Sequence, residues 1–256
     1  MRWTLALLVI GGCSEGSVAE REPTPTPSAS STATAPPSAV DAGPDHAPSA
    51  ALKRCAGAPA EPASIVDAVA LLNALAPADG PCVVAALRRP LSVVATRGVT
   101  SAQPAASKAS PRLFFLLPKV VISAVPEGEG GKLLEFGQWT SATQTLKGEV
   151  ALPVTTPLAP DAPFQKVLQD RYRTVCGTCH RGEQGHPSIP SAFISAAFKP
   201  EPGTFVTVAE LAEHHAACAR SADPSPRCEM FHALFDFGAV TQGAFAPEVE
   251  TFFTTP

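Results

Sequence analysis

The spacing of hydrophobic residues changes within the first half of the chain. A helical spacing of apolar side chains follows Ser64, a residue suited to cap a helix: Ile65, Val66, Val69, Leu72 and Leu75. Shorter β-branched runs then predict strands at 93–95, 113–117, 120–125 and 133–136. The Gly-rich segment 127–131 reads as a hairpin loop between two of these strands. We therefore predict a β-rich domain with one helix over residues 53–160.

The second half, residues 161–256, shows patterns that favour helices. One apolar stripe runs toward Cys176: Phe164, Val167, Leu168, Tyr172 and Val175. Thr207 and Glu210 have the spacing of a capping box. Ser225-Pro226 would start a further helix, and Gly238 stands where that helix would stop. The predicted fold class is α+β, with the β-rich domain followed by a mostly α-helical domain.

The N-terminus has the layout of an export signal. Arg2 precedes an apolar run at 4–10, and Gly11-Gly12 stand directly before Cys13. The segment Ile10–Cys13 resembles the lipobox of bacterial lipoproteins, which implies a signal peptide at 1–12 and lipidation of Cys13; a plain secretory signal is the alternative. Residues 13–50 are rich in Pro, Ser, Thr and Ala and predict a disordered tether. Ser14 resembles the residue that directs lipoproteins to the outer membrane, so we expect a membrane-anchored protein that faces the periplasm.

Composition and charge narrow the function classes only slightly. The chain has 256 residues, 45% of them hydrophobic and 16% charged, with a net charge of −4. This balance is globular, and the 28 prolines exceed what one domain needs. No basic cluster is visible, so we expect no nucleic-acid partner. The metalloprotease motif H-E-x-x-H is absent from the sequence.

The seven cysteines can be divided among three uses. Cys13 is the candidate lipid anchor. In an oxidising compartment we expect a disulfide between Cys55 and Cys82, which would staple the predicted helix to the first strand. We expect a second disulfide between Cys218 and Cys228, across the turn Ser221-Ala222-Asp223-Pro224. The two cysteines that remain are Cys176 and Cys179.

Cys176, Cys179 and His180 form the motif C-x-x-C-H. Two thiols at this spacing can reach the two vinyl groups of a haem, and the adjacent histidine can reach its iron. Three alternatives remain open for these residues. They are a thioredoxin-like dithiol, a zinc site completed by Cys218, Cys228 or a distant histidine, and a short-range disulfide.

The segment around the motif resembles the small c-type cytochromes, over about 95 residues. The resemblance implies one haem c, with Cys176 and Cys179 as thioether anchors and His180 as the proximal iron ligand. Met230 is the only methionine after the predicted signal peptide and is one candidate for the distal ligand; His215 is its rival. His186 lies in a predicted loop near the motif.

The function expected from these patterns is single-electron transfer by a tethered monohaem lipoprotein with unidentified redox partners. One alternative is a haem sensor or peroxidase-like protein whose sixth coordination position is open. The other is a lipoprotein without haem that is stapled by disulfides and binds a partner. Nothing in residues 53–160 indicates a function for that segment.

Overall fold

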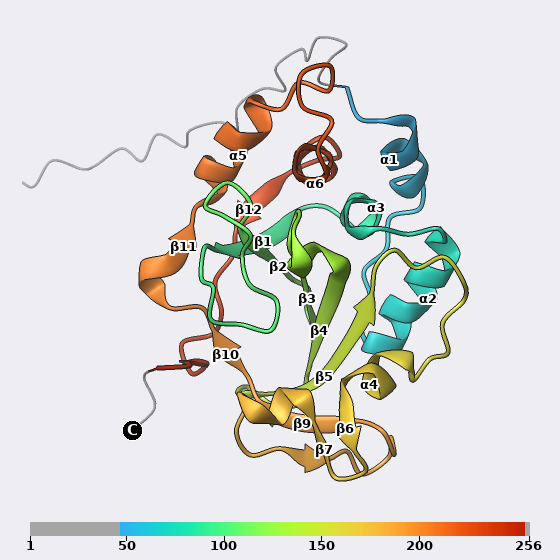
Figure 1. Ribbon diagram of the computed structural model, residues 1–256, viewed down its shortest axis with the longest axis vertical. Helices are drawn as coiled ribbons and strands as arrows, with labels where there is room; N and C mark the ends of the chain where they lie inside the picture. The colour runs from blue at the N-terminus through green and yellow to red at the C-terminus, as the bar shows by residue number, and fades with distance from the viewer. Residues whose placement is uncertain (1–46, 254–256) are drawn as a thin grey trace, which may run out of the picture. The chain divides into compact units, whose positions relative to one another are not determined.

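The computed structural model describes residues 47–253 (Figure 1). The predicted signal peptide, Cys13 and nearly all of the predicted tether at 13–50 lie outside these residues. The described residues form one compact unit. None of the helices in the described range has the length and apolarity needed to cross a membrane.

The predicted strands of the first half are confirmed. They form four neighbours of an antiparallel sheet: β1 (Leu91–Thr96), β2 (Arg112–Leu116), β3 (Val120–Ala124) and β4 (Leu133–Trp139). The Gly-rich segment connects β3 to β4, as predicted, and includes the short 3₁₀ helix η2 (Glu129–Lys132). A further strand, β5 (Gln144–Ala151), pairs with β4 from Thr145 to Ala151.

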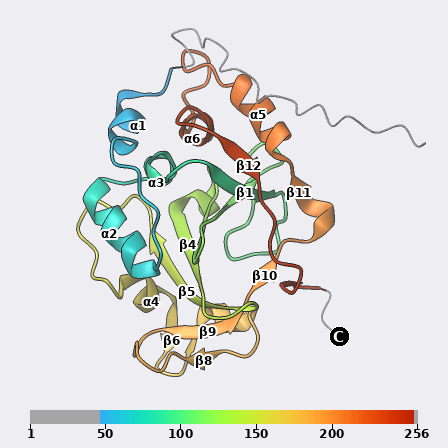
Figure 2. The same ribbon diagram turned by 180° about the vertical axis from the view of Figure 1, so that it is seen from behind.

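The predicted mostly α-helical second domain is wrong. Residues after 161 extend the same sheet instead, which has nine strands in the order β11-β1-β2-β3-β4-β5-β9-β8 with β12 also paired to β1. Figure 2 shows β12 beside β1. The added strands are β8 (Gln184–Gly185), β9 (Phe193–Ala196), β11 (Phe205–Val206) and β12 (Val240–Gln242).

The helix predicted to lead into Cys176 is also wrong. Helix α4 (Ala162–Val167) ends after six residues, and the chain then forms the hairpin β6 (Leu168–Asp170) and β7 (Arg173–Thr174). The physical reason is at the turn, where the Asp170 carboxylate accepts a hydrogen bond from the Tyr172 backbone N–H at 2.8 Å. Tyr172 and Val175 are 70% and 52% exposed, so the end of the apolar stripe does not face the core.

The other helices follow their predicted signals closely. The helix predicted after Ser64 is confirmed as α2 (Ile65–Leu75). Thr207 and Glu210 form the predicted capping box of α5 (Val208–Ala216). Ser225 caps α6 (Pro226–Phe235), and Gly238 follows that helix with a positive φ of 132°. Two short helices had not been predicted, α1 (Ala50–Cys55) and α3 (Gly80–Ala86).

Both predicted disulfides are confirmed. Cys55 pairs with Cys82 and Cys218 pairs with Cys228. The first bond connects α1 to α3 instead of joining the predicted helix to a strand.

One hydrophobic core spans both halves of the chain. Helix α3 contacts α1, α2 and α6, and α4 packs against β5. Gly148 on β5 permits this last contact, because a Cβ there would lie 2.9 Å from Cβ of Pro163. The core includes buried side chains from distant segments, such as Leu52, Leu72, Phe115, Leu134, Phe164 and Phe231. The remaining short elements are β10 (Phe198–Lys199), which pairs with β13 (Glu250–Thr251), and the 3₁₀ helix η4 (Pro202–Thr204).

Candidate functional site

The C-x-x-C-H motif lies on a tight turn directly after β7. The turn is the 3₁₀ helix η3 (Val175–Thr178), and the Thr174 hydroxyl caps it by accepting a hydrogen bond from the Cys176 N–H at 3.1 Å. The backbone N–H groups of Cys179 and His180 both donate to the Cys176 carbonyl, at 3.1 and 2.8 Å. The backbone therefore folds around Cys176 and holds all three motif residues in one compact turn.

Glu183 closes this turn from the other side. Its carboxylate accepts hydrogen bonds from the Thr174 backbone N–H at 2.8 Å and from the Thr174 hydroxyl at 2.5 Å. Gly177 leaves room for it, since a Cβ at that position would lie 2.6 Å from Oε1 of Glu183. The absence of a side chain at Gly177, the first variable position of the motif, therefore allows the Glu183 carboxylate to reach Thr174.

Removing the Glu183 carboxylate is expected to destabilise the turn. Thr174 is buried, so Glu183→Ala leaves its N–H without an acceptor and should lower the free energy of unfolding by about 1–3 kcal/mol. Glu183→Gln keeps one acceptor oxygen and should cost about half as much. Urea unfolding of the two variants beside wild type measures both costs. Equal losses in the two variants would contradict this role for the second oxygen.

His180 presents one ring nitrogen for binding. Its Nδ1 lies 2.8 Å from the Ala196 carbonyl oxygen at the end of β9. A carbonyl can only accept, so Nδ1 carries the proton and the neutral ring keeps its lone pair on Nε2. Burial, with a smaller effect of the Lys147 charge, lowers the pKa of His180 to about 4, so the ring is neutral at pH 7. The ring also stacks on Phe198, with centroids 5.3 Å apart.

Cys176 and Cys179 are not bridged, whereas the other four described cysteines form disulfides. Cys179 is exposed and Cys176 is half-buried. Burial is the main cause that raises the pKa of the Cys176 thiol to about 11. Dithiol redox proteins and zinc sites use the thiolate, which this environment disfavours.

A buried lysine lies behind the motif. Lys147 on β5 is 9% exposed, and its ammonium donates to the Thr145 hydroxyl and, at 3.2 Å, to the Ala196 carbonyl. The same carbonyl therefore accepts from both Lys147 and His180. Burial lowers the pKa of Lys147 to about 8. At neutral pH a positive charge therefore lies beside His180, in a position with little access to water.

Aromatic residues extend outward from His180. Phe198 contacts the Phe252 ring edge to face at 5.9 Å, and Phe252 contacts Phe253 at 5.1 Å. Phe252 and Phe253 remain exposed. Apolar side chains that are left in water near one site are typical of a surface that another group covers.

The structure does not bring either predicted distal ligand to the motif. Met230 is buried in the core, where its Cε would lie 3.1 Å from a Cβ at Gly80. His215 is bonded to Asp236. Both views place α5 and α6, which carry these residues, at the opposite end of the sheet from β7 (Figures 1 and 2). His186 directly follows β8, and its Nδ1 accepts a hydrogen bond from the Ser188 N–H at 3.2 Å.

Four parts of this site were not predicted from the sequence, namely Glu183, Lys147, the Ala196 carbonyl and Phe198. The only local signal was the closeness of Glu183 to the motif. Lys147 and Ala196 reach His180 through the pairing of β5 with β9, which a helical interpretation of residues 161–256 excludes.

The chain matches no protein-family model. Comparisons with curated proteins and with solved structures also found no match.

Proposed function

We propose that the chain carries one haem c at Cys176, Cys179 and His180 and transfers single electrons. The observation that carries the proposal is the set of three groups on one turn: two unbridged cysteines and a histidine whose Nδ1 is bonded to a carbonyl, which leaves Nε2 for iron. Histidines that bind metal commonly donate their other ring N–H to a carbonyl or carboxylate in this way.

The residues present are compatible with covalent attachment. Each thiol of Cys176 and Cys179 would add across one vinyl group, with its sulfur on one carbon and its hydrogen on the other, so attachment needs no oxidant. The bound iron would supply the one-electron redox chemistry. Tyr172, Val175 and Phe253 offer exposed apolar surface near the turn, which a haem could cover. The carrier would be a disulfide-stapled antiparallel β-sheet protein.

Export belongs to the same proposal. Haem c is attached outside the cytoplasm, and the lipobox-like segment before Cys13 supports export and a lipid anchor, with the protein facing the periplasm. The redox partners would be proteins of that compartment.

Haem attachment can be tested on the full chain expressed with cytochrome c maturation proteins. We expect a c-type pyridine haemochrome spectrum and an intact mass that includes one haem. The double variant Cys176→Ala/Cys179→Ala should lose both, because no sulfur remains to form a thioether. Thr178→Ala is the matched control: the side chain is exposed, lies within the motif and bears no proposed role. A colourless wild-type protein without added mass would contradict the proposal.

A second function is favoured by one observation, the separation of Met230 and His215 from the motif. If no side chain of the protein completes the iron coordination, the sixth position takes water or an external ligand, as in haem sensors and peroxidases. The same preparation distinguishes the two functions. A high-spin spectrum that shifts on adding azide or imidazole favours an open position, whereas a low-spin spectrum that these ligands leave unchanged favours electron transfer.

A further inference from the structure

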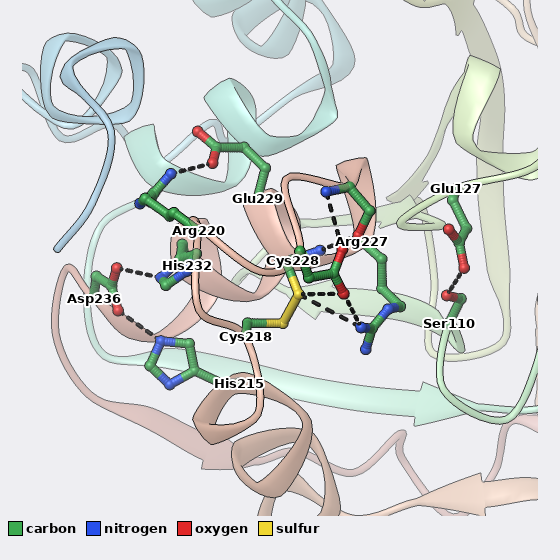
Figure 3. Close-up of a disulfide and its surroundings, with 12 residues drawn as sticks. Ser110, Glu127, His215, Cys218, Arg220, Arg227, Cys228, Glu229, His232 and Asp236 are labelled. Carbon is green, nitrogen blue, oxygen red and sulfur yellow. Dashed lines mark hydrogen bonds and ion pairs between the residues drawn. A yellow bond between two sulfur atoms is a disulfide. The ribbon is translucent and has the colours of Figure 1, made fainter. Parts of the chain in front are cut away.

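A second group of potential ligand atoms lies between α5 and α6, at the opposite end of the sheet from the C-x-x-C-H turn (Figures 1 and 3). The Asp236 carboxylate lies between two imidazoles. One oxygen is 2.7 Å from Nε2 of His215, and the other is 2.8 Å from Nδ1 of His232. One ligand atom from each of the three residues can be chosen so that all lie within 4.8 Å of one another.

The local sequence places these three side chains together. His232 and Asp236 are four residues apart at the end of α6, so they lie on one face of that helix. His215 comes from the last turn of α5, and its ring meets that of His232 edge to face with centroids 5.2 Å apart. The disulfide between Cys218 and Cys228 ties the two helices just beyond His215, which limits how far the histidines can separate.

Burial distinguishes this group from a surface ion pair. His232 is fully buried, and its Nε2 has no hydrogen-bond partner among the described residues. The ring faces Asp236 with Nδ1, so Nε2 is the nitrogen that would carry the proton if Nδ1 bound an ion. The His215 side chain is 23% exposed and the Asp236 side chain 9%, so one side of the group opens toward solvent.

We propose that His215, His232 and Asp236 form a binding site for a divalent transition metal ion, with Zn²⁺ as the best match. Two imidazoles and one carboxylate are a ligand set that zinc accepts, and three protein ligands leave a fourth position for water. The partly exposed side at His215 is the side from which water would complete the coordination. This site is separate from the proposed haem site and does not depend on it.

Metal binding requires a rearrangement of the group. Zinc bonds of about 2.0–2.2 Å place tetrahedral ligand atoms about 3.3 Å apart, so the carboxylate must withdraw by about half an ångström from each ring. Ligand atoms that now lie further apart than this, within the 4.8 Å limit, must approach each other. The ion replaces the two protons that now face Asp236. Each proton moves to the other nitrogen of its own ring, so neutral imidazoles remain neutral and no electron is transferred.

The test is calorimetric titration of Zn²⁺ into the full chain after treatment with EDTA. Every sample carries Cys176→Ala and Cys179→Ala, so that free thiols do not bind the ion. We expect one equivalent of Zn²⁺ to bind, and His215→Ala to weaken the binding by about tenfold or more. His186→Ala is the matched control, because this histidine is solvent-accessible and lies outside the group.

Asp236→Asn is the second variant, because it keeps the shape of the side chain while it removes the charge. It should weaken Zn²⁺ binding as His215→Ala does, and far-UV circular dichroism at the titration temperature shows that both variants are folded. Absence of Zn²⁺ binding at submillimolar concentration would overturn the proposal and leave the group as hydrogen bonds between two helices. Binding that His215→Ala and Asp236→Asn leave unchanged would also overturn it.

Discussion

Replacing both Cys55 and Cys82 by alanine is expected to lower the free energy of unfolding by about 3.5 kcal/mol near room temperature. The two residues are 27 positions apart, and a cross-link stabilises mainly by restricting the unfolded chain, by an amount that grows with the size of the closed loop. The bond also connects α1 to α3, which contacts α6 in the core. Urea unfolding monitored by circular dichroism measures the loss.

The second disulfide provides the matched comparison. Cys218 and Cys228 are only ten positions apart, and the same chain-entropy relation gives about 2.7 kcal/mol for removing that bond. The Cys55/Cys82 variant should therefore be the less stable of the two by nearly 1 kcal/mol. The opposite order would show that local packing around α5 and α6 outweighs the restriction of the unfolded chain.

Replacing Lys147 by methionine is expected to stabilise the protein at pH 7. Burial lowers the pKa of Lys147 to about 8, from 10.5, so keeping its charge in the folded state costs about 3 kcal/mol at neutral pH. Loss of the hydrogen bonds to Thr145 and Ala196 offsets about 1 kcal/mol or somewhat more of this. The net gain should be about 1–2 kcal/mol, measured by urea unfolding.

The pH dependence of that gain identifies its cause. Between pH 8 and 10.5 the unfolded chain holds the lysine proton more tightly than the folded chain, so wild-type stability rises with pH in this window. The advantage of Lys147→Met over wild type should therefore shrink from pH 8 upward, disappear near about pH 9 and be reversed by about pH 10.5, where only the lost hydrogen bonds remain. An advantage that stays constant with pH would point to improved packing instead of removal of a buried charge.

The same substitution has an expected effect on a bound haem. Lys147 and His180 donate to one carbonyl, so the ammonium lies on the proximal side of the proposed iron site. Positive charge there disfavours the oxidised iron, and Lys147→Met should lower the midpoint potential at pH 7.

Capping residues and hydrophobic spacing correctly predicted the helices and strands whose formation depends mainly on neighbouring residues. Ser64, Thr207 and Ser225 each cap the helix that was predicted to follow them. The β-branched runs became β1 to β4 because their apolar side chains are needed on the core side of the sheet. The cysteine pairing was also predictable. Setting aside the motif and Cys13 left four cysteines, of which Cys55 and Cys82 flank the predicted helix and Cys218 and Cys228 stand across one turn.

Sequence patterns did not predict the segments whose structure depends on pairing with strands that are distant in the chain. The stripe from Phe164 to Val175 has helical spacing, but the turn at Asp170 interrupts it. Of the apolar side chains in this stripe, only Phe164 and Val167 are buried in the core. β5 combines Gln144, Lys147 and Glu149 with apolar neighbours, and its pairing with β4 and β9 makes it a strand.

The site was predictable only as far as the motif itself. Cys176, Cys179 and His180 are adjacent in sequence, so their spacing could be interpreted directly. Glu183 and Lys147 act through a turn and a strand pair that have no signature of their own. The grouping of His215 with His232 and Asp236 requires the packing of α5 on α6, which the sequence does not specify.

The chain enters the folded unit beside α6. The Ala47 carbonyl accepts a hydrogen bond from Arg220, and the Ser49 hydroxyl donates to Glu229 on α6, each at 2.5 Å. If the protein is attached to another structure through the residues before 47, the attachment therefore lies at the α6 end of the folded unit. The C-x-x-C-H turn lies at the other end of the sheet (Figure 1), so a tethered molecule would present it to whatever approaches from the far side.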